Sequence, residues 1–345
     1  REAKSVIYKT FANVDSVPIA LKTQDADEIV EIVRCLAPSF GGFCLESIAA
    51  PKCFTIESRI RKAVRVSVLH HEFHAAGIIV LAALTNALKV VGKSLTEVKI
   101  VINGAGAAGI GVAKGLLVAG VDNVVLCDRH GALRVYRMVG MNWAKSEIAR
   151  LMRPHEVKGH LAEVIKGADV FIGLSDKGLV TQEMIASMAR DPVVFALALP
   201  EPEIGEAEAK SAGARVVATG LSDSDNQIRS SLVTPGFFRG CLDVGANRVN
   251  VAMYLAAARA LAAMIPEEKL ASDNIIPRQM DWRISPVVAR AVAQAAQETG
   301  VAQLTPPDVT PEMVYERTER YIYEGELAWL PSEGQDYGKL SIDQE

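Results

Sequence analysis

Residues 98–128 read VKIVINGAGAAGIGVAKGLLVAGVDNVVLCD, and this stretch decides the fold of the chain. It opens with a run of β-branched apolar residues, which is typical of a buried strand, and a glycine-rich turn follows directly. The next apolar segment has the pattern of a helix that ends at Gly120, and a second apolar run ends in Asp128. Strand, glycine-rich turn, helix and strand in this order predict a βαβ unit.

Apolar runs of the same kind recur after this unit, and segments with a helical pattern separate them. Runs that are apolar throughout indicate strands buried on both faces of a parallel sheet. With right-handed crossovers they predict an α/β fold with a doubly wound parallel sheet, that is, a Rossmann domain. The runs are VFIGLS at 170–175, VVFALAL at 193–199 and RVVATG at 215–220.

The flanking segments predict further helices. Asp25 or Asp27 is expected to cap a helix that ends near Pro38, because proline cannot continue it. Residues 75–91 carry an apolar face at helical spacing, and Gly92 ends it. Downstream, helical patterns resume at 247–264 and 286–299.

These patterns divide the chain into three parts. We expect a partial smaller α/β domain at 1–75, the Rossmann domain at 76–303 and a polar tail at 304–345. The tail contains aromatic residues that we expect to cover a subunit or domain surface. They are Tyr315, Tyr321, Tyr323 and Trp329.

Composition excludes several classes of protein. The 345 residues carry a formal net charge of -4, so a nucleic acid is not an expected partner. The apolar stretches are interrupted before about 18 residues and the first ten residues are charged and polar, which predicts neither a transmembrane helix nor a signal peptide. Five cysteines without CxxC spacing indicate buried free thiols in a reducing compartment, so the expected location is the cytoplasm.

The glycine-rich turn has the GxGxxG pattern at Gly104, Gly106 and Gly109. The first glycine permits a tight turn, the second lets the backbone approach a pyrophosphate, and the third allows close packing of helix on strand. The helix that begins at Ala107 and Ala108 would direct unpaired N–H groups at the phosphates. This context predicts a dinucleotide site, and a Rossmann-like domain that has lost its nucleotide is the alternative.

Two further positions belong to this predicted site. Asp128 ends the second strand, where a carboxylate would bind the ribose hydroxyls and repel a 2′-phosphate. This favours NAD over NADP, although Arg129 could pair with such a phosphate. Ser175, at the end of the next apolar run, is a further candidate contact to the cofactor.

Several long strings resemble those of bacterial-type malic enzymes, and the resemblance extends from residue 1 to about 303. It implies a divergent two-domain subunit that assembles as a dimer or higher oligomer. The implied reaction is the oxidative decarboxylation of malate, a small hydroxy acid, with NAD(P) and a divalent metal. The strings include FANVDSVPIALKTQDADEIVEIVRCLAPSFGGFCLES at 11–47, CDRHGAL at 127–133, DPVVFALALPEPEI at 191–204 and PGFFRGCLDV at 235–244.

The resemblance also implies catalytic residues. Lys4, in the string EAKSVIYK, stands where the family has a lysine base that takes the 2-hydroxyl proton. The family's tyrosine acid lies further upstream, before the first residue of this sequence, so we expect it either to be absent from the protein or to lie in a segment that precedes this sequence.

The metal-binding strings of the family are altered in this chain. A Glu-Asp pair reads Glu46-Ser47 here, and a His-Asp-Asp string reads His70-His71-Glu72. Glu46 and Glu72 are the candidate ligands for Mg²⁺ or Mn²⁺, but one carboxylate is lost and another is moved by a methylene, so we expect weak binding. His71 replaces an Asp with a catalytic role and could act as acid or base at neutral pH.

A zinc site is an alternative for the same segment. His71 and His74 are one helical turn apart, and Glu46 could join them. The string HHEFH does not have the HExxH spacing of zinc proteases, so the signal is weak.

Substrate-side positions differ from the family as well. Leu199 stands where the family has an Asn, and Arg229-Ser230 stands where it has two. Loss of these amides predicts a changed ligand or no ligand. Arg229 could pair with an anionic group, or simply point to solvent.

Two hypotheses follow from these observations. In the first, the chain oxidises a malate-like 2-hydroxy acid with NAD, with or without decarboxylation, and Lys4 and His71 carry the chemistry. In the second, it is a non-catalytic or partner-dependent homologue that binds NAD but lacks a working metal and acid site. The intact phosphate loop and Lys4 favour the enzyme.

Overall fold

The computed structural model describes residues 2–153 and 157–324, and its centre is a six-stranded sheet in the order β5-β4-β3-β6-β7-β8. All neighbouring strands are parallel except the edge strand β5, which is antiparallel to β4. Each parallel strand lies within one of the apolar runs, so the doubly wound sheet is confirmed. The strands are β3 (Ile100–Asn103), β4 (Val124–Asp128), β5 (Gly131–Ala132), β6 (Val170–Gly173), β7 (Val193–Ala196) and β8 (Val216–Thr219).

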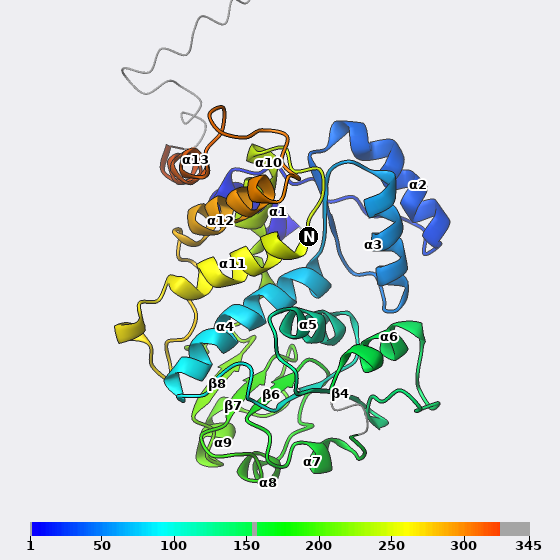
Figure 1. The fold of residues 1–345 in the computed structure, drawn as a ribbon, viewed down its shortest axis with the longest axis vertical. Coiled ribbons are helices and arrows are strands. Elements are labelled where there is room, and N and C mark those ends of the chain that lie inside the picture. Colours follow the sequence, from blue (N-terminus) through cyan, green and yellow to red (C-terminus); the bar gives the residue numbers. More distant parts are fainter. Residues whose placement is uncertain (1, 154–156, 325–345) are drawn as a thin grey trace, which may run out of the picture.

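Helices cover both faces of this sheet (Figure 1). Alternate side chains of β3 point to opposite faces, so Ile100 and Ile102 join one apolar core and Val101 joins another. The first core includes α5 (Ala107–Val118) and α6 (Trp143–Leu151), and the second includes the short helices of the other face. Those short helices are α7 (Leu161–Val164), α8 (Gln182–Ala186) and α9 (Glu206–Ser211).

The segment before residue 71 forms a smaller unit with its own apolar core. Two parallel strands, β1 (Gly42–Leu45) and β2 (Ser67–His70), pair in its centre, and the two helices that follow residue 25 accompany them. The first helix of the chain instead contributes its buried Tyr8 and Ala12 to the larger core on the first face of the sheet. Asp25 accepts hydrogen bonds from the N–H groups of Asp27 and Glu28, which confirms the predicted cap. The helices are α1 (Glu2–Ala12), α2 (Ala26–Leu36) and α3 (Lys52–Ala63), and the 3₁₀ turn η1 (Ala37–Ser39) follows α2.

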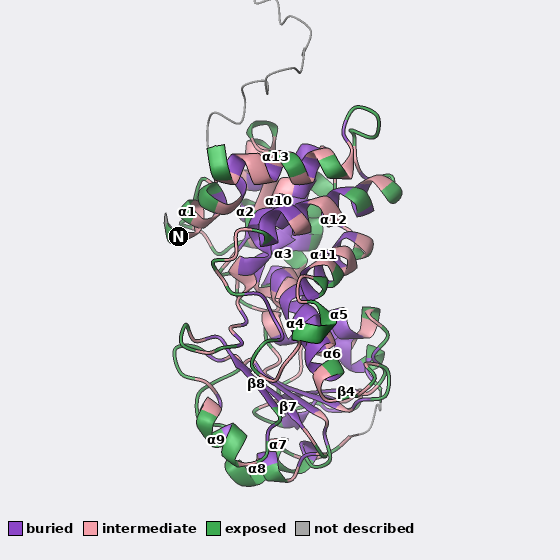
Figure 2. Ribbon diagram, turned by 90° about the vertical axis from the view of Figure 1, so that its left-hand side faces the viewer, coloured by how far each residue is buried: buried purple, intermediate pink, exposed green. Residues whose placement is uncertain are grey.

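One long helix connects this unit to the sheet. It begins as the π-helical turn η2 (His71–Ala75) and continues as α4 (Ala76–Val90), whose residues are almost all buried (Figure 2). By length and composition alone, His71–Val90 could cross a membrane, which the interrupted apolar pattern did not predict. However, 67% of its most apolar window is buried inside the molecule, as in the core helix of a folded domain.

The last described segments form a helical layer on the side of α4 that faces away from the sheet (Figure 1). Within it α12 packs against α10, α11 and α13, and α1 packs on α10. The sequence pattern did not predict the helix at 311–324, and residues 325–345, with Trp329, lie outside the described part. The elements are η3 (Ser230–Leu232), α10 (Thr234–Asp243), α11 (Val251–Ala263), η4 (Glu267–Lys269), α12 (Ile284–Glu298) and α13 (Pro311–Glu324).

All five cysteines are free thiols. Cys53, Cys127 and Cys241 are buried as expected. The expectation was wrong for Cys35 and Cys44, which are exposed and do not belong to the apolar core of the small N-terminal unit.

Candidate active site

The glycine-rich turn has the geometry of a phosphate loop. Gly104 has a φ of +119°, and a Cβ there would lie 2.3 Å from the carbonyl oxygen of Leu174. A Cβ on Gly109 would lie 1.7 Å from the carbonyl oxygen of Gly104, so helix α5 could not start this close to β3 with a larger residue. A Cβ on Gly106 would meet nothing within 4 Å, which leaves open space in front of the helix.

Helix α5 begins in that open space without a side-chain cap. Gly106 is its N-cap, and Ala107 and Ala108 are its first two residues. The free N–H groups of this first turn can therefore receive a phosphate.

Asp128 lies at the end of β4, where the sequence places it, but its carboxylate already has partners. Arg137 donates to both of its oxygens at 2.8 and 2.5 Å, and Lys145 donates at 2.7 Å. Burial acts to raise the pKa of Asp128, but these hydrogen bonds outweigh it and lower the pKa to about 2. Sequence reasoning missed both cations, and Arg129, which it did name, is exposed.

A buried carboxylate holds the neighbouring loops at this edge of the sheet. Glu203 is fully buried and accepts hydrogen bonds from the backbone N–H groups of Ser175 and Ala198, both at 3.0 Å. The side chain of Asn103, which ends β3, donates to the Ser175 hydroxyl at 2.8 Å. Ser175 is thus fixed beside the phosphate loop, and Glu203 is a third residue that the sequence pattern did not predict.

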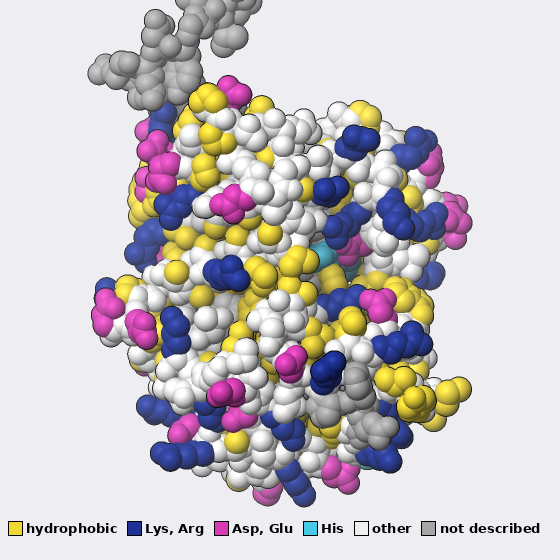
Figure 3. Space-filling model, viewed as in Figure 1, with side chains coloured by type: hydrophobic (Ala, Val, Ile, Leu, Met, Phe, Trp, Pro, Cys, Tyr) yellow, Lys and Arg dark blue, Asp and Glu magenta, His cyan; other side chains and the backbone are white. Residues whose placement is uncertain are grey.

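A second cluster of polar residues forms where β1 and β2 end. Because these strands are parallel, their carboxyl ends meet at one edge, and Glu46 and Glu72 follow them there. Lys4 of α1 donates a hydrogen bond to Glu46, and the Ser47 N–H donates to Glu72 at 3.0 Å. In Figure 3 a recess opens between the surface formed by α2 and α3 and the rest of the molecule, and histidine and acidic side chains lie in it.

The charges in this cluster act on one another. Burial acts to raise the pKa of Glu46, but the hydrogen bond and positive charge of Lys4 lower it overall. Burial lowers the pKa of His71 to about 4, and the charge of Lys4 lowers it further. His71 is therefore neutral at physiological pH.

His71 contacts a predicted substrate residue that is distant in sequence. Its Nε2 lies 2.7 Å from the hydroxyl of Ser230, the first residue of η3. Its Nδ1 is buried and has no hydrogen-bond partner within the part of the chain that the structure describes. One ring nitrogen of His71 is thus held by Ser230, and the other is buried without a partner among the described residues.

Arg229 and Leu199 are placed differently. The Arg229 side chain donates to the carbonyl oxygen of Gly220 at 2.7 Å, a contact that ties it to the loop after β8. Leu199 is 58% exposed at the end of β7 and packs near Gly220.

The residues present do not fit a divalent metal. Among residues 2–153 and 157–324, no three side chains of His, Cys, Asp or Glu are arranged to hold one. Glu46 is bound by Lys4, Glu72 by a backbone N–H, and Ser47 supplies only a hydroxyl. Hard cations need several charged oxygens, and this cluster offers two carboxylates, each of which already has one oxygen engaged.

The zinc alternative is not formed either. His74 points to Glu57 of α3, with its Nε2 3.5 Å from that carboxylate, and its Nδ1 lies 3.2 Å from the backbone N–H of His70. Burial lowers its pKa to about 3. It is part of the packing between η2 and α3 rather than of the Lys4 cluster.

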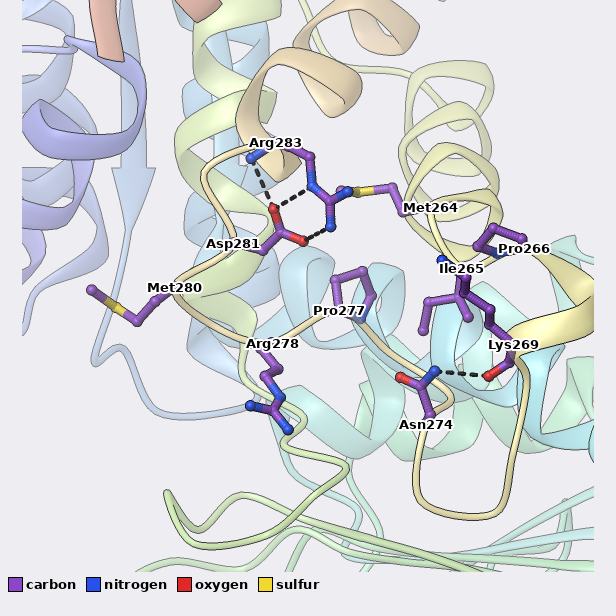
Figure 4. Close-up of a pocket in the computed structure, with 10 residues that line it drawn as sticks. All are labelled: Met264, Ile265, Pro266, Lys269, Asn274, Pro277, Arg278, Met280, Asp281 and Arg283. Atoms are coloured by element: carbon purple, nitrogen blue, oxygen red, sulfur yellow. Dashed lines mark hydrogen bonds and ion pairs between the residues drawn. The ribbon is translucent and has the colours of Figure 1, made fainter. Parts of the chain in front are cut away.

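A surface pocket of about 520 Å³ lies elsewhere, between the end of α11 and the start of α12 (Figure 4). None of the predicted site residues lines it. Gln279, which lies between two lining residues in the sequence, donates a hydrogen bond to Ser231 at 3.1 Å. The lining residues are Met264, Ile265, Pro266, Lys269, Asn274, Pro277, Arg278, Met280, Asp281 and Arg283.

Comparison with known proteins agrees with these features. Residues 73–297 match the family described as malic enzyme, NAD binding domain. The chain is 49% identical over 325 residues to the bifunctional malic/malolactic enzyme of Bacillus subtilis (strain 168), which covers 94% of this chain and 78% of that protein. It is 46% identical over 303 residues to the NAD-dependent malic enzyme of Geobacillus stearothermophilus, where the alignment covers 88% of this chain but only 63% of the relative.

A solved structure has the same fold. The crystal structure of malic enzyme from Pyrococcus horikoshii Ot3 superimposes with a TM-score of 0.89 at 39% identity, over 95% of this chain and 77% of that one.

Proposed function

The chain belongs to the malic enzyme family, and from this premise we propose that it oxidises a malate-like 2-hydroxy acid with NAD and then releases CO₂. The small hydroxy acid would lie in the recess at the ends of β1 and β2. We propose that residues 1–75 supply most of the substrate contacts and 76–303 most of the cofactor contacts. Part of 304–345 would cover the helical layer.

One observation carries this proposal: the helix that follows the phosphate loop packs directly on the turn that contains His71. A Cβ on Gly111 of α5 would lie 2.2 Å from the backbone oxygen of Phe73, which belongs to η2. His71 and Glu72 are in the same turn. A dinucleotide on the first turn of α5 would therefore reach toward the recess that contains them.

The residues of the recess suffice for the oxidation. Bound NAD supplies the hydride acceptor for C2. We propose that the neutral imidazole of His71 takes the 2-hydroxyl proton, while the contact of its Nε2 with Ser230 fixes the ring. Oxidation leaves a keto group β to the second carboxylate, so loss of CO₂ gives an enolate whose oxygen the ammonium of Lys4 can stabilise. We propose Lys4 and His71 as the catalytic residues.

We propose NAD as the cofactor, with less discrimination against NADP than Asp128 alone would give. Arg137 and Lys145 offset the negative charge of that carboxylate and would attract a 2′-phosphate. The phosphate-loop residues Gly104, Gly106 and Gly109 would bind the pyrophosphate of either form.

The subunits of this family point to a homo-oligomer, and we propose a dimer in the cytoplasm. Light scattering of the purified chain tests the assembly, and a mass of one subunit would contradict it.

We propose that Glu46 and Glu72 line the substrate recess and do not act as ligands of Mg²⁺ or Mn²⁺.

The first test follows NADH formation from NAD with a panel of 2-hydroxy diacids that includes L-malate, for the wild type and for His71→Ala. We expect turnover by the wild type and a fall in kcat of at least about 100-fold in the variant, because a general base is removed. His130→Ala, an exposed histidine, is the control. Equal turnover by His71→Ala would remove His71 from the mechanism, and no turnover by the wild type despite NAD binding would support the non-catalytic alternative.

A further inference from the structure

A lysine lies among the acidic groups of the recess. The ammonium of Lys4 donates to the Glu46 carboxylate, and the next residue, Ser47, binds Glu72 through its backbone N–H. The peptide group between Glu46 and Ser47 thus links the two carboxylates. The ammonium of Lys4, on α1, reaches the Glu46 carboxylate at the ends of the strands.

The same charge acts on several neighbours. Lys4 lowers the pKa of Glu46 and of His71, while Glu46 and Glu72 both act to raise the pKa of His71. The side chains of Lys4, Glu46 and Glu72 are 32%, 33% and 36% exposed, so they line the wall of the recess and are not sealed inside the protein. A solute that enters the recess meets all three.

This proposal rests on the proposed function. We propose that the ammonium of Lys4 is the resident cation of the recess and that the site binds its hydroxy acid without a divalent metal. Two carboxylates and one ammonium leave a single negative charge, which is too little to hold a dication in competition with water. Ser47 contributes no third carboxylate, and its backbone N–H occupies an oxygen of Glu72 that a metal would need.

The arrangement has a consequence for the reaction. An ammonium beside the substrate's oxygen supplies positive charge where the enolate develops, and the partly desolvated recess strengthens it. It also attracts the carboxylates of the incoming acid. A fixed lysine thereby takes both electrostatic roles that a metal ion would take.

The test measures Mn²⁺ binding by the electron paramagnetic resonance signal of the free ion, without substrate or NAD. The wild type is expected to bind no Mn²⁺ at the recess up to millimolar concentration. Lys4→Met leaves two uncompensated carboxylates, so its affinity for Mn²⁺ should rise by at least about tenfold, whereas Lys4→Arg should behave as the wild type. Lys9→Met is the matched control, because Lys9 lies on the same helix and pairs with Asp15 at 3.0 Å outside the recess.

A second pair of variants locates the binding. Glu46→Gln combined with Lys4→Met should abolish the gained affinity, and Glu31→Gln combined with Lys4→Met should keep it, since Glu31 is exposed on α2. Circular dichroism melts establish that each variant is folded. Binding of Mn²⁺ at the recess of the wild type at or below about 1 mM, or a Lys4→Met variant without gain, would overturn the proposal. Neither result depends on turnover, so the proposed function is tested separately by NADH formation.

Discussion

At the scale of single residues, Asp128 differs most from what its position suggests. A carboxylate at the end of the second strand normally faces the ribose, but here Arg137 forms a two-pronged pair with it and Lys145 adds a third contact. The side chains of Asp128 and Arg137 are only 9% and 6% exposed, so this pairing is not a surface ion pair. The two cations outnumber the one carboxylate here, and we expect this charge to influence the choice between NAD and NADP.

We expect Arg137→Met to lower kcat/KM for NADP by about tenfold and to change that for NAD much less, because the 2′-phosphate loses an attractive charge. Arg134→Met, in the same loop, is the control. Steady-state kinetics with both nucleotides measure the ratio. An equal loss for NAD and NADP would mean that Arg137 only supports the loop.

At the scale of elements, the packing of α4, α5 and α11 depends on missing side chains. The hydroxyl of Tyr254 on α11 is wedged between Gly77 of α4 and Gly115 of α5, where an added Cβ would lie 2.1 and 2.0 Å from it. That hydroxyl is buried and has no partner among the described residues. The three helices thus meet closely at a hydroxyl group that contacts two glycines and forms no hydrogen bond with the described residues.

Gly77→Ala is expected to lower the free energy of unfolding by about 1–3 kcal/mol, because the tyrosine must move in a packed core. Tyr254→Phe removes the hydroxyl that clashes, so it should raise stability by about 1 kcal/mol alone and recover much of the loss in the double variant. Urea unfolding measures all four proteins. Strictly additive effects would show that the glycine is small for another reason.

At the scale of the whole molecule, the small N-terminal unit and the sheet are joined through η2, and buried charge lies at this junction. Glu57 of α3 is 5% exposed and faces Arg61 and His74. Burial raises the pKa of Glu57 to about 7, although Arg61 acts to lower it. A carboxyl group with a raised pKa binds a proton more tightly in the folded state than in the unfolded chain.

The free energy of unfolding should therefore fall as the pH rises from about 4.5 to about 7 through the contribution of Glu57, by about 3 kcal/mol at most. His74, whose pKa is lowered, opposes this trend below about pH 6.5. Glu57→Gln removes the Glu57 contribution, so the variant should gain stability relative to the wild type as the pH rises from 5 to 7.5. Unfolding curves at several pH values measure the difference, and Glu97→Gln is an exposed control. A pH-independent difference would contradict the raised pKa.

The sequence predicted what local pattern encodes. The GxGxxG turn, the strand runs and the Asp25 cap depend on residues close in the chain, and the structure has them in place. Arg137, Lys145 and Glu203 could not be predicted, because each acts through a contact that only the folded loops create. The pairing of His71 with Ser230 spans 159 positions, so no spacing rule could reveal it.

The helix that starts at His71 and ends at Val90 contains both a proposed catalytic residue and much of the buried core. A surface loop can be replaced without changing the core, but this turn is directly continued by the buried helix α4. Its π geometry sets the rotational phase between His71 and the buried stripe of α4: deleting one residue from 71–75 would rotate the histidine by roughly 100° about the axis. Engineering of this recess should therefore use substitutions within the turn and keep the number of its residues unchanged.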